Sequence, residues 1–161
     1  MADLQPALDQ VGKGRSFATG KEVFTAAQCI LCHRMGNEGG SVGPDLSAVS
    51  SRFARRDILE SILEPSKVLS EQFLNTVFTK KDGTEITGRI AEENDQRVLV
   101  TINPLSPTQV EIRKADIESR VFSKISPMPE GLVNNFSQQE ILDLLAYLES
   151  GAKPAAANFN Q

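Results

Sequence analysis

The residues best suited to chemistry lie together in one short segment, Cys29-Ile30-Leu31-Cys32-His33. This segment contains both cysteines and the only histidine of the chain. Two thiols separated by two residues, with an imidazole directly after the second, form a CxxCH motif. Three kinds of site can use such a motif: a zinc ion, a redox-active dithiol and a covalently attached haem.

The rest of the sequence distinguishes these three kinds of site. A structural zinc ion needs four ligands, and the chain has no further Cys or His to complete the set. A thioredoxin-like dithiol opens a helix that follows a strand, whereas the residues before Cys29 predict a helix. In a c-type haem site both thiols bind the vinyl groups, and the imidazole of His33 binds the iron. The motif therefore favours one covalently bound haem c.

Helices are predicted on both sides of this motif. A helix over about 19–27 leads into it, and four glycines between residues 36 and 43 predict a loop after it. Apolar residues at helical spacing predict a second helix between Phe53 and Glu64, which Pro65 ends. The motif should therefore lie between two helices that can cover an apolar cofactor.

A different periodicity follows the second helix. From Gln72 to Ser123 apolar residues alternate or cluster as in strands, and Asp82-Gly83 is a hairpin signal. A last helix is predicted to begin at Ser137, which can form a capping box with Glu140. We therefore expect a β-rich segment between helical parts.

The order of these elements predicts the domain organisation. Residues 1–16 are expected to form a flexible arm and residues 151–161 a flexible tail. Residues 17–150 are expected to form one domain, interrupted by a β-rich insertion over 71–124.

Composition excludes several classes of protein. The 161 residues are 40% hydrophobic and 24% charged, which is typical of one folded domain. The formal net charge of -4 leaves no basic surface for nucleic acid, so we expect no nucleic-acid partner. Apolar runs are far shorter than the roughly 20 residues of a transmembrane helix, so we expect no membrane insertion.

Together these motifs resemble class I c-type cytochromes, and most closely the PVC-type haem-binding domain of large bacterial proteins. The residues that carry the resemblance are Gly20-Lys21 with Phe24, Cys29 to Arg34, Gly39-Gly40, Val42-Gly43-Pro44-Asp45-Leu46, Arg52, Ile58 to Ser66, Ser126-Pro127-Met128-Pro129-Glu130-Gly131-Leu132 and Asp143 to Leu148.

The resemblance implies a fold class. We expect a mostly α class I cytochrome c fold with a β-rich, antiparallel insertion between the second main helix and the methionine loop. In class I cytochromes the first and last helices cross, and Gly20, Phe24, Leu144 and Tyr147 stand at the corresponding positions.

A second axial ligand would determine the chemistry of the iron. Of the three methionines, Met35 is too near His33 to cross the haem plane, and Met1 is at the chain end. Met128 lies between Pro127 and Pro129, which restrict the backbone, and its sequence context resembles the methionine loop of the family. The alternative is that Met128 only packs as an apolar loop residue.

Two more residues gain roles from the resemblance. The carbonyl of Pro44 is expected to accept a hydrogen bond from the second ring nitrogen of His33, although Gly43-Pro44 is also compatible with a simple turn. Arg52 is expected to bind a haem propionate, or else to be solvated. Arg55 and Arg56 are weaker candidates for the same role, and more often such residues form one solvated helix face.

The expected function is one-electron transfer by an iron with His33 and Met128 as ligands, in a protein that is not itself an enzyme. The alternative is a haem sensor or peroxidase-like enzyme with an open sixth position, although no second histidine can act there. In a third interpretation the β-rich segment docks a partner or dimerises.

Location and partners follow from the same chemistry. Thioether attachment occurs outside the cytoplasm, so we expect a periplasmic or otherwise extracytoplasmic protein. Residues 1–14 lack the apolar core of a signal peptide, so the export signal has been removed or the chain is a domain of a longer protein. The acidic balance favours a redox partner with a positive docking surface, either a dehydrogenase donor or a downstream acceptor.

Overall fold

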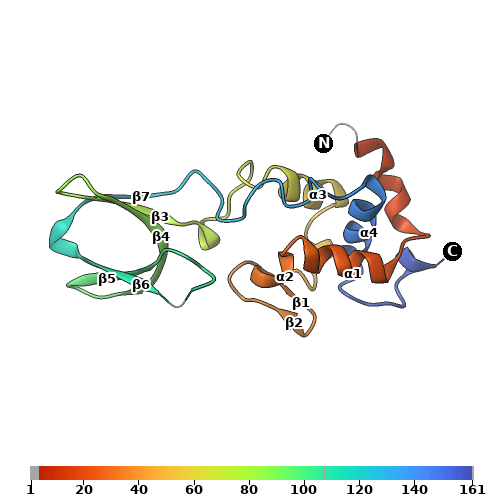
Figure 1. The fold of residues 1–161 in the computed structure, drawn as a ribbon, viewed down its shortest axis with the longest axis horizontal. Coiled ribbons are helices and arrows are strands. Elements are labelled where there is room, and N and C mark those ends of the chain that lie inside the picture. The colour runs from red at the N-terminus through yellow and green to blue at the C-terminus, as the bar shows by residue number, and fades with distance from the viewer. Residues whose placement is uncertain (1–3, 107, 161) are drawn as a thin grey trace. The chain divides into compact units, whose positions relative to one another are not determined.

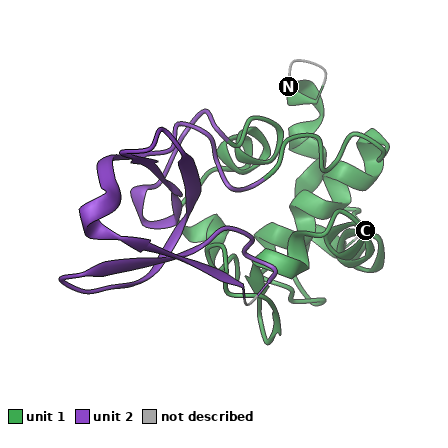
Figure 2. Ribbon diagram, turned by 60° about the vertical axis from the view of Figure 1, so that its left-hand side comes forward, with its two compact units in different colours: residues 1–65, 129–161 green, residues 66–128 purple. Residues whose placement is uncertain are grey.

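The computed structural model describes residues 4–106 and 108–160 and divides into two compact units (Figures 1 and 2). Unit 1 combines Met1–Pro65 with Pro129–Gln161, and unit 2 is Ser66–Met128. Unit 1 holds the α-helices and unit 2 holds a five-stranded sheet. The CxxCH motif therefore belongs to the helical unit.

Unit 1 is built from short helices joined by long connections. Its elements are η1 (Gln5–Gly12), α1 (Phe17–Ala26), α2 (Cys29–Cys32), β1 (Arg34–Met35), β2 (Glu38–Gly39), η2 (Val49–Ser51), α3 (Arg55–Leu63), α4 (Gln138–Glu149) and η5 (Ala157–Phe159). Ser16 caps α1 by accepting a hydrogen bond from Thr19 N at 3.1 Å. The capping box predicted for α4 is present, because Glu140 accepts from Ser137 N at 2.7 Å.

The core of unit 1 lies where α1 crosses α4. A Cβ at Gly20 would collide with the carbonyl oxygen of Asp143 and lie 2.8 Å from Tyr147 Cβ, so only glycine lets the helices approach this closely. The ring of Phe24 lies 5.6 Å from that of Tyr147, and Leu144 is fully buried. The crossing predicted from these four residues is therefore present.

Residues expected to form flexible ends pack against this core. In η1, Ala7, Leu8 and Val11 are buried. Near the other end, the ring of Phe159 lies 5.3 Å from that of Phe17 in an edge-on arrangement. Asn158 donates to Val11 O at 3.1 Å, so the two ends of the chain are also hydrogen-bonded to each other.

The side chain of Arg55 connects three elements of unit 1, which are α3, α4 and η1. Arg55 in α3 donates to both carboxylate oxygens of Glu149 in α4, at 2.6 and 2.9 Å, and to Leu8 O at 2.7 Å. The interpretation of Arg55 as a solvated residue is therefore wrong, because its partners lie too far along the chain to be seen from the sequence.

Unit 2 is an antiparallel sheet in the order β6-β5-β4-β3-β7. Its elements are η3 (Glu71–Phe73), β3 (Thr76–Lys80), β4 (Glu85–Glu93), β5 (Arg97–Thr101), β6 (Gln109–Arg113), η4 (Lys114–Asp116) and β7 (Ile117–Phe122). Its core is formed by Phe78, Val98, Val100 and Ile112, which are almost completely buried. The predicted Asp82-Gly83 hairpin joins β3 and β4, and Asp82 accepts from Thr84 N at 2.9 Å.

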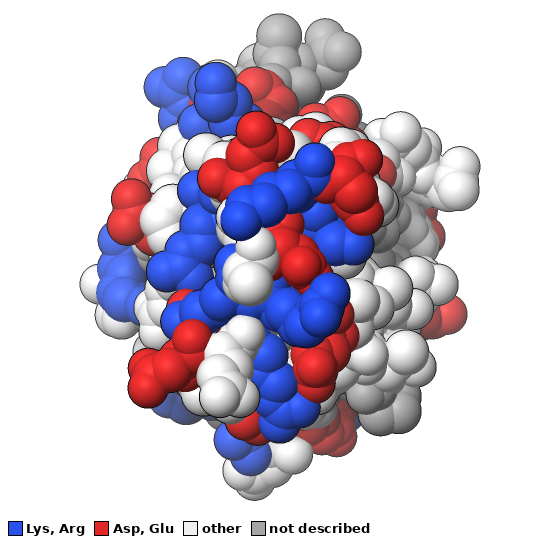
Figure 3. Space-filling view, turned by 90° about the vertical axis from the view of Figure 1, so that its left-hand side faces the viewer, with Lys and Arg blue, Asp and Glu red and all other residues white. Residues whose placement is uncertain are grey.

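Charged side chains of both signs lie intermixed on one face of the molecule. On the face shown in Figure 3, Lys and Arg alternate with Asp and Glu, and neither sign dominates. In unit 2, Glu93 pairs with Lys114 at 2.7 Å and with Arg120 at 2.9 Å. These exposed pairs neutralise one another and contribute little stability individually.

The expectation of a mostly α fold is wrong. The structure is 35% helix and 22% strand and contains a five-stranded antiparallel sheet. The β-rich segment forms a compact unit with its own apolar core, and α2 spans only four residues. The helices around the motif are the clearest sequence signals, but they make up a minority of the chain.

Within the residues that the structure describes, none of the helices has the length and apolar character needed to cross a bilayer.

Candidate haem-binding site

A sharp turn between α1 and α2 presents the CxxCH motif. The turn residue Gln28 adopts a left-handed conformation with φ 62°, which is uncommon outside glycine, and its N–H donates to Thr25 O at 3.0 Å. The following single helical turn places Cys29 and Cys32 three residues apart on one side. His33 ends this turn and donates its backbone N–H to Cys29 O at 2.9 Å.

The loop after the motif wraps back onto it. Gly40 N donates to Ile30 O at 2.9 Å, and Gly43 N donates to Cys32 O at 2.8 Å. A Cβ at Gly39 would collide with His33 O, and Gly39 also has a positive φ of 101°. The predicted glycine loop is thus a close-fitting support for the motif.

The imidazole of His33 is oriented by Pro44. His33 Nδ1 lies 2.8 Å from Pro44 O, and because a carbonyl only accepts, Nδ1 carries the proton. Burial lowers the pKa of His33 more than the Pro44 carbonyl raises it, which favours the neutral ring. The lone pair is therefore on Nε2, the arrangement found in metal-bound histidines.

Gly43 packs directly against the same ring. A Cβ at this position would lie 2.8 Å from His33 Cε1 and 3.0 Å from Nδ1, closer than side-chain atoms pack. Gly43 therefore helps to set the plane of the imidazole. Sequence reasoning identified Gly43 only as part of a turn, because a contact between a Cα hydrogen and a ring has no sequence signal.

The two cysteines are free and partly buried. Burial is the main cause that raises the pKa of Cys29 to about 11, and burial also raises the pKa of Cys32. Reactive dithiols instead have thiol pKa values below the ordinary range, so this environment argues against dithiol chemistry. In the part of the chain that the structure describes, no cluster of three or more His, Cys, Asp or Glu is placed to hold a metal ion.

Arg52 lies on the loop that carries Pro44. Its Nη2 is 3.5 Å from Asp45 O, and its guanidinium lies 5.8 Å from the ring centre of Phe53. Hydrogen bonds from Ser47, followed by the charges of Arg34 and Arg52, lower the pKa of Asp45. Arg52 is therefore an exposed cation beside Asp45, the residue that follows Pro44.

The three methionines have different surroundings. Met35 is only 2% exposed and packs in the core of unit 1, and Met1 lies outside the described residues. Met128 is half-buried and is the last residue of unit 2. Its backbone N–H donates to Ser126 Oγ at 3.1 Å.

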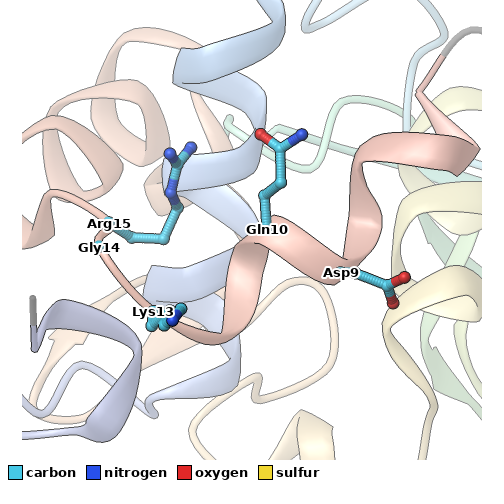
Figure 4. Close-up of a pocket in the computed structure, with 5 residues that line it drawn as sticks. All are labelled: Asp9, Gln10, Lys13, Gly14 and Arg15. Atoms are coloured by element: carbon cyan, nitrogen blue, oxygen red, sulfur yellow. The ribbon is translucent and has the colours of Figure 1, made fainter.

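A separate hollow beside η1 does not have the character of a catalytic site. Asp9, Gln10, Lys13, Gly14 and Arg15 line it, and none of these is a Cys, His or Met. Figure 4 shows that Gln10 and Arg15 point to one side while Asp9 points away from them. Arg15 instead pairs with Asp143 of α4 at 3.6 Å, which gives it a structural role.

The motif and its loop fit a c-type haem. Two free thiols lie one helical turn apart, and the adjacent imidazole is neutral, fixed by Pro44 and able to bind iron through Nε2. A family model described as Cytochrome c matches residues 17–152, which includes the motif, both crossing helices and the whole of unit 2. A search of curated proteins found no match.

Proposed function

Because the chain belongs to the cytochrome c family, which comprises haem-binding electron-transfer proteins, we propose that it is a monohaem cytochrome that transfers one electron at a time. In this proposal Cys29 and Cys32 would hold the haem by thioether bonds, and His33 and Met128 would bind the iron. The chain would be a PVC-type haem-binding domain and not itself an enzyme. The observation that carries the proposal is the 2.8 Å hydrogen bond between His33 Nδ1 and Pro44 O.

The residues that surround His33 would keep the site rigid during electron transfer. When bound, the haem supplies an iron that alternates between the ferric and ferrous states, gaining or losing one electron. Pro44 and Gly43 hold the ring of His33 in one orientation, so this ligand does not have to move. A ligand that does not move keeps the reorganisation energy of each electron transfer small.

Arg52 would bind a propionate in this proposal. It is exposed, and its planar guanidinium can bind a carboxylate through two hydrogen bonds. The nearby carbonyl of Asp45 and ring of Phe53 limit the positions that it can take.

Met128 would be the sixth ligand. Pro127 and Pro129 fix the backbone on either side, which reduces the entropy lost when the thioether binds. A thioether with an imidazole favours the ferrous state and raises the reduction potential. His33 and Met128 would then leave no open position on the iron. This feature distinguishes an electron carrier from a haem sensor or peroxidase, which needs an open position.

The location and the partners are also part of the proposal. We expect a periplasmic or otherwise extracytoplasmic protein, because thioether attachment occurs there. With a net charge of -4, the protein would dock a redox partner through a basic surface on that partner, whether a dehydrogenase donor or a later acceptor. A docking or dimerising role for unit 2 stays a prediction.

The first test is the number and behaviour of the haem in the purified protein. One haem per chain should remain attached after denaturation, and a potentiometric titration should follow a one-electron Nernst curve. The ferrous spectrum should not change on addition of CO. Loss of the haem on denaturation would contradict thioether attachment, and ready CO binding would favour the sensor or peroxidase interpretation.

A further inference from the structure

The two ends of unit 2 are joined by a chain of hydrogen bonds that ends at Met128. Ser126 N donates to the side-chain oxygen of Ser66 at 3.1 Å, although 60 residues separate them. Met128 N in turn donates to the side-chain oxygen of Ser126 at 3.1 Å. Ser66 is the first residue of unit 2 and Met128 is the last. The hydroxyls of Ser66 and Ser126, here called the serine clamp, thus tie the methionine to the start of the unit.

The sequence around Met128 leaves few other ways to hold its backbone. Pro127 and Pro129 have no N–H, so Met128 carries the only amide donor across these three residues. That donor is the one that Ser126 accepts. Each residue before a proline is also restricted to extended conformations, which applies to Ser126 and Met128. The backbone at Met128 is therefore fixed by two prolines and one hydrogen bond.

The serine clamp is partly sheltered from solvent, whereas two apolar residues near it are exposed. Ser66, Ser126 and Met128 are half-buried, whereas Val68 and Ile125 are 76% and 71% exposed. Hydrogen bonds that are partly shielded from water contribute more to holding a conformation than exposed ones. The sheet of unit 2 continues from the clamp, because Ser123 N donates to Asn75 O at 2.8 Å just before β3.

We propose that unit 2 serves as the scaffold of the sixth iron ligand, and that Ser66 and Ser126 are positioning residues for Met128. This inference rests on the proposed function, in which Met128 binds the iron. A thioether binds ferric iron weakly, so its hold depends on being pre-positioned. Weakening the clamp should make Met128 easier to displace while leaving the haem and His33 in place.

Displacement by imidazole measures this hold directly. The ferric holoprotein is titrated with imidazole, and the methionine-to-iron charge-transfer band in the near infrared is followed. Ser66→Ala and Ser126→Ala should each lower the imidazole concentration at half-displacement by about three- to tenfold, the effect of one lost hydrogen bond. Ser126→Thr keeps the hydroxyl and should behave as the wild type.

Ser123→Ala is the matched control. Ser123 accepts from Ile125 N at 3.1 Å in the same loop, whereas Met128 N donates to Ser126. Its titration should match that of the wild type. If the two clamp variants titrate as the wild type, or if Ser123→Ala weakens the ligand equally, the clamp is contradicted while Met128 ligation stands. If the wild type lacks the band, or keeps it in Met128→Ala, both proposals are wrong.

Discussion

His33 Nδ1 lies 2.8 Å from the carbonyl oxygen of Pro44, and this contact determines which ring nitrogen can bind iron. The carbonyl belongs to a loop whose glycines pack against the motif, so the tautomer and the plane of the ring are set together. The ligand is therefore prepared by main-chain atoms, which keep their positions when side chains vary.

Gly43→Ala should disturb this arrangement. The new methyl group would lie 2.8 Å from His33 Cε1, so the ring or the loop must move. We expect a loss of about 1–3 kcal/mol in the free energy of unfolding of the holoprotein, together with altered ferric EPR g-values. Gly12→Ala is the control, since its nearest atom would be 3.9 Å away. Unchanged g-values in Gly43→Ala would show that this glycine does not orient the ring.

Gly20→Ala should weaken the crossing of α1 and α4. Its Cβ would meet backbone of α4, which cannot move without separating the helices. We expect a loss of about 3 kcal/mol in unfolding free energy, measured by guanidinium denaturation. Ala18→Leu, on the exposed side of α1, should cost less than about 0.5 kcal/mol. Equal stability of the two variants would argue against a tight crossing.

Arg55→Ala should be costly because three acceptors depend on this side chain. The change leaves Glu149, whose side chain is 15% exposed, without its cation, and Leu8 O without its donor. We expect a loss of about 2 kcal/mol. Replacing Arg55 and Glu149 together by Met should cost less unfolding free energy than the sum of the costs of Arg55→Met and Glu149→Met. A double-mutant cycle of these variants measures the difference. Additive losses would mean that the interaction energy between Arg55 and Glu149 is zero.

The capping box of α4 should make stability depend on pH. Hydrogen bonds from Ser137 lower the pKa of Glu140 below 4.5 in the folded state. A lowered folded-state pKa stabilises the fold above the unfolded-state pKa, and this stabilisation disappears as the pH falls through the lower folded value. Glu140→Gln should therefore unfold more readily than the wild type near neutral pH, and the difference should vanish in acid.

Denaturation curves over a pH series measure this difference. Glu22→Gln removes an exposed carboxylate from α1 and serves as the control. Its difference in unfolding free energy from the wild type should not depend on pH in the way expected for Glu140→Gln. A difference between Glu140→Gln and the wild type that persists at low pH would contradict the charge-based explanation.

The sequence predicted the parts of the site that depend on residue type. The CxxCH motif, the glycine loop and the cap at Ser137 are local signals with direct chemical meaning. The left-handed Gln28 was not predictable, because glutamine gives no signal for that conformation. The carbonyl of Pro44 has no signature of its own, and its role was expected only from a resemblance.

Long-range packing was the main source of error. The contact of Phe159 with Phe17 and the pairing of Arg55 with Glu149 join residues far apart in the chain, which local patterns do not connect. For the same reason the alternating residues of unit 2 predicted strands, but they did not predict how large a share of the structure the five-stranded sheet makes up. Local periodicity identifies elements, whereas their share of the structure depends on which of them find a common core.

The central claim is tested most directly by the ferric near-infrared spectrum of the holoprotein and its Met128→Ala variant. A methionine-to-iron charge-transfer band should be present in the wild type, absent from Met128→Ala and retained in Met35→Leu, because Met35 is buried in the core of unit 1. Addition of CO to the ferrous protein should change the spectrum only in Met128→Ala. A high-spin wild type that binds CO, or a band that survives in Met128→Ala, would contradict the His33/Met128 electron carrier.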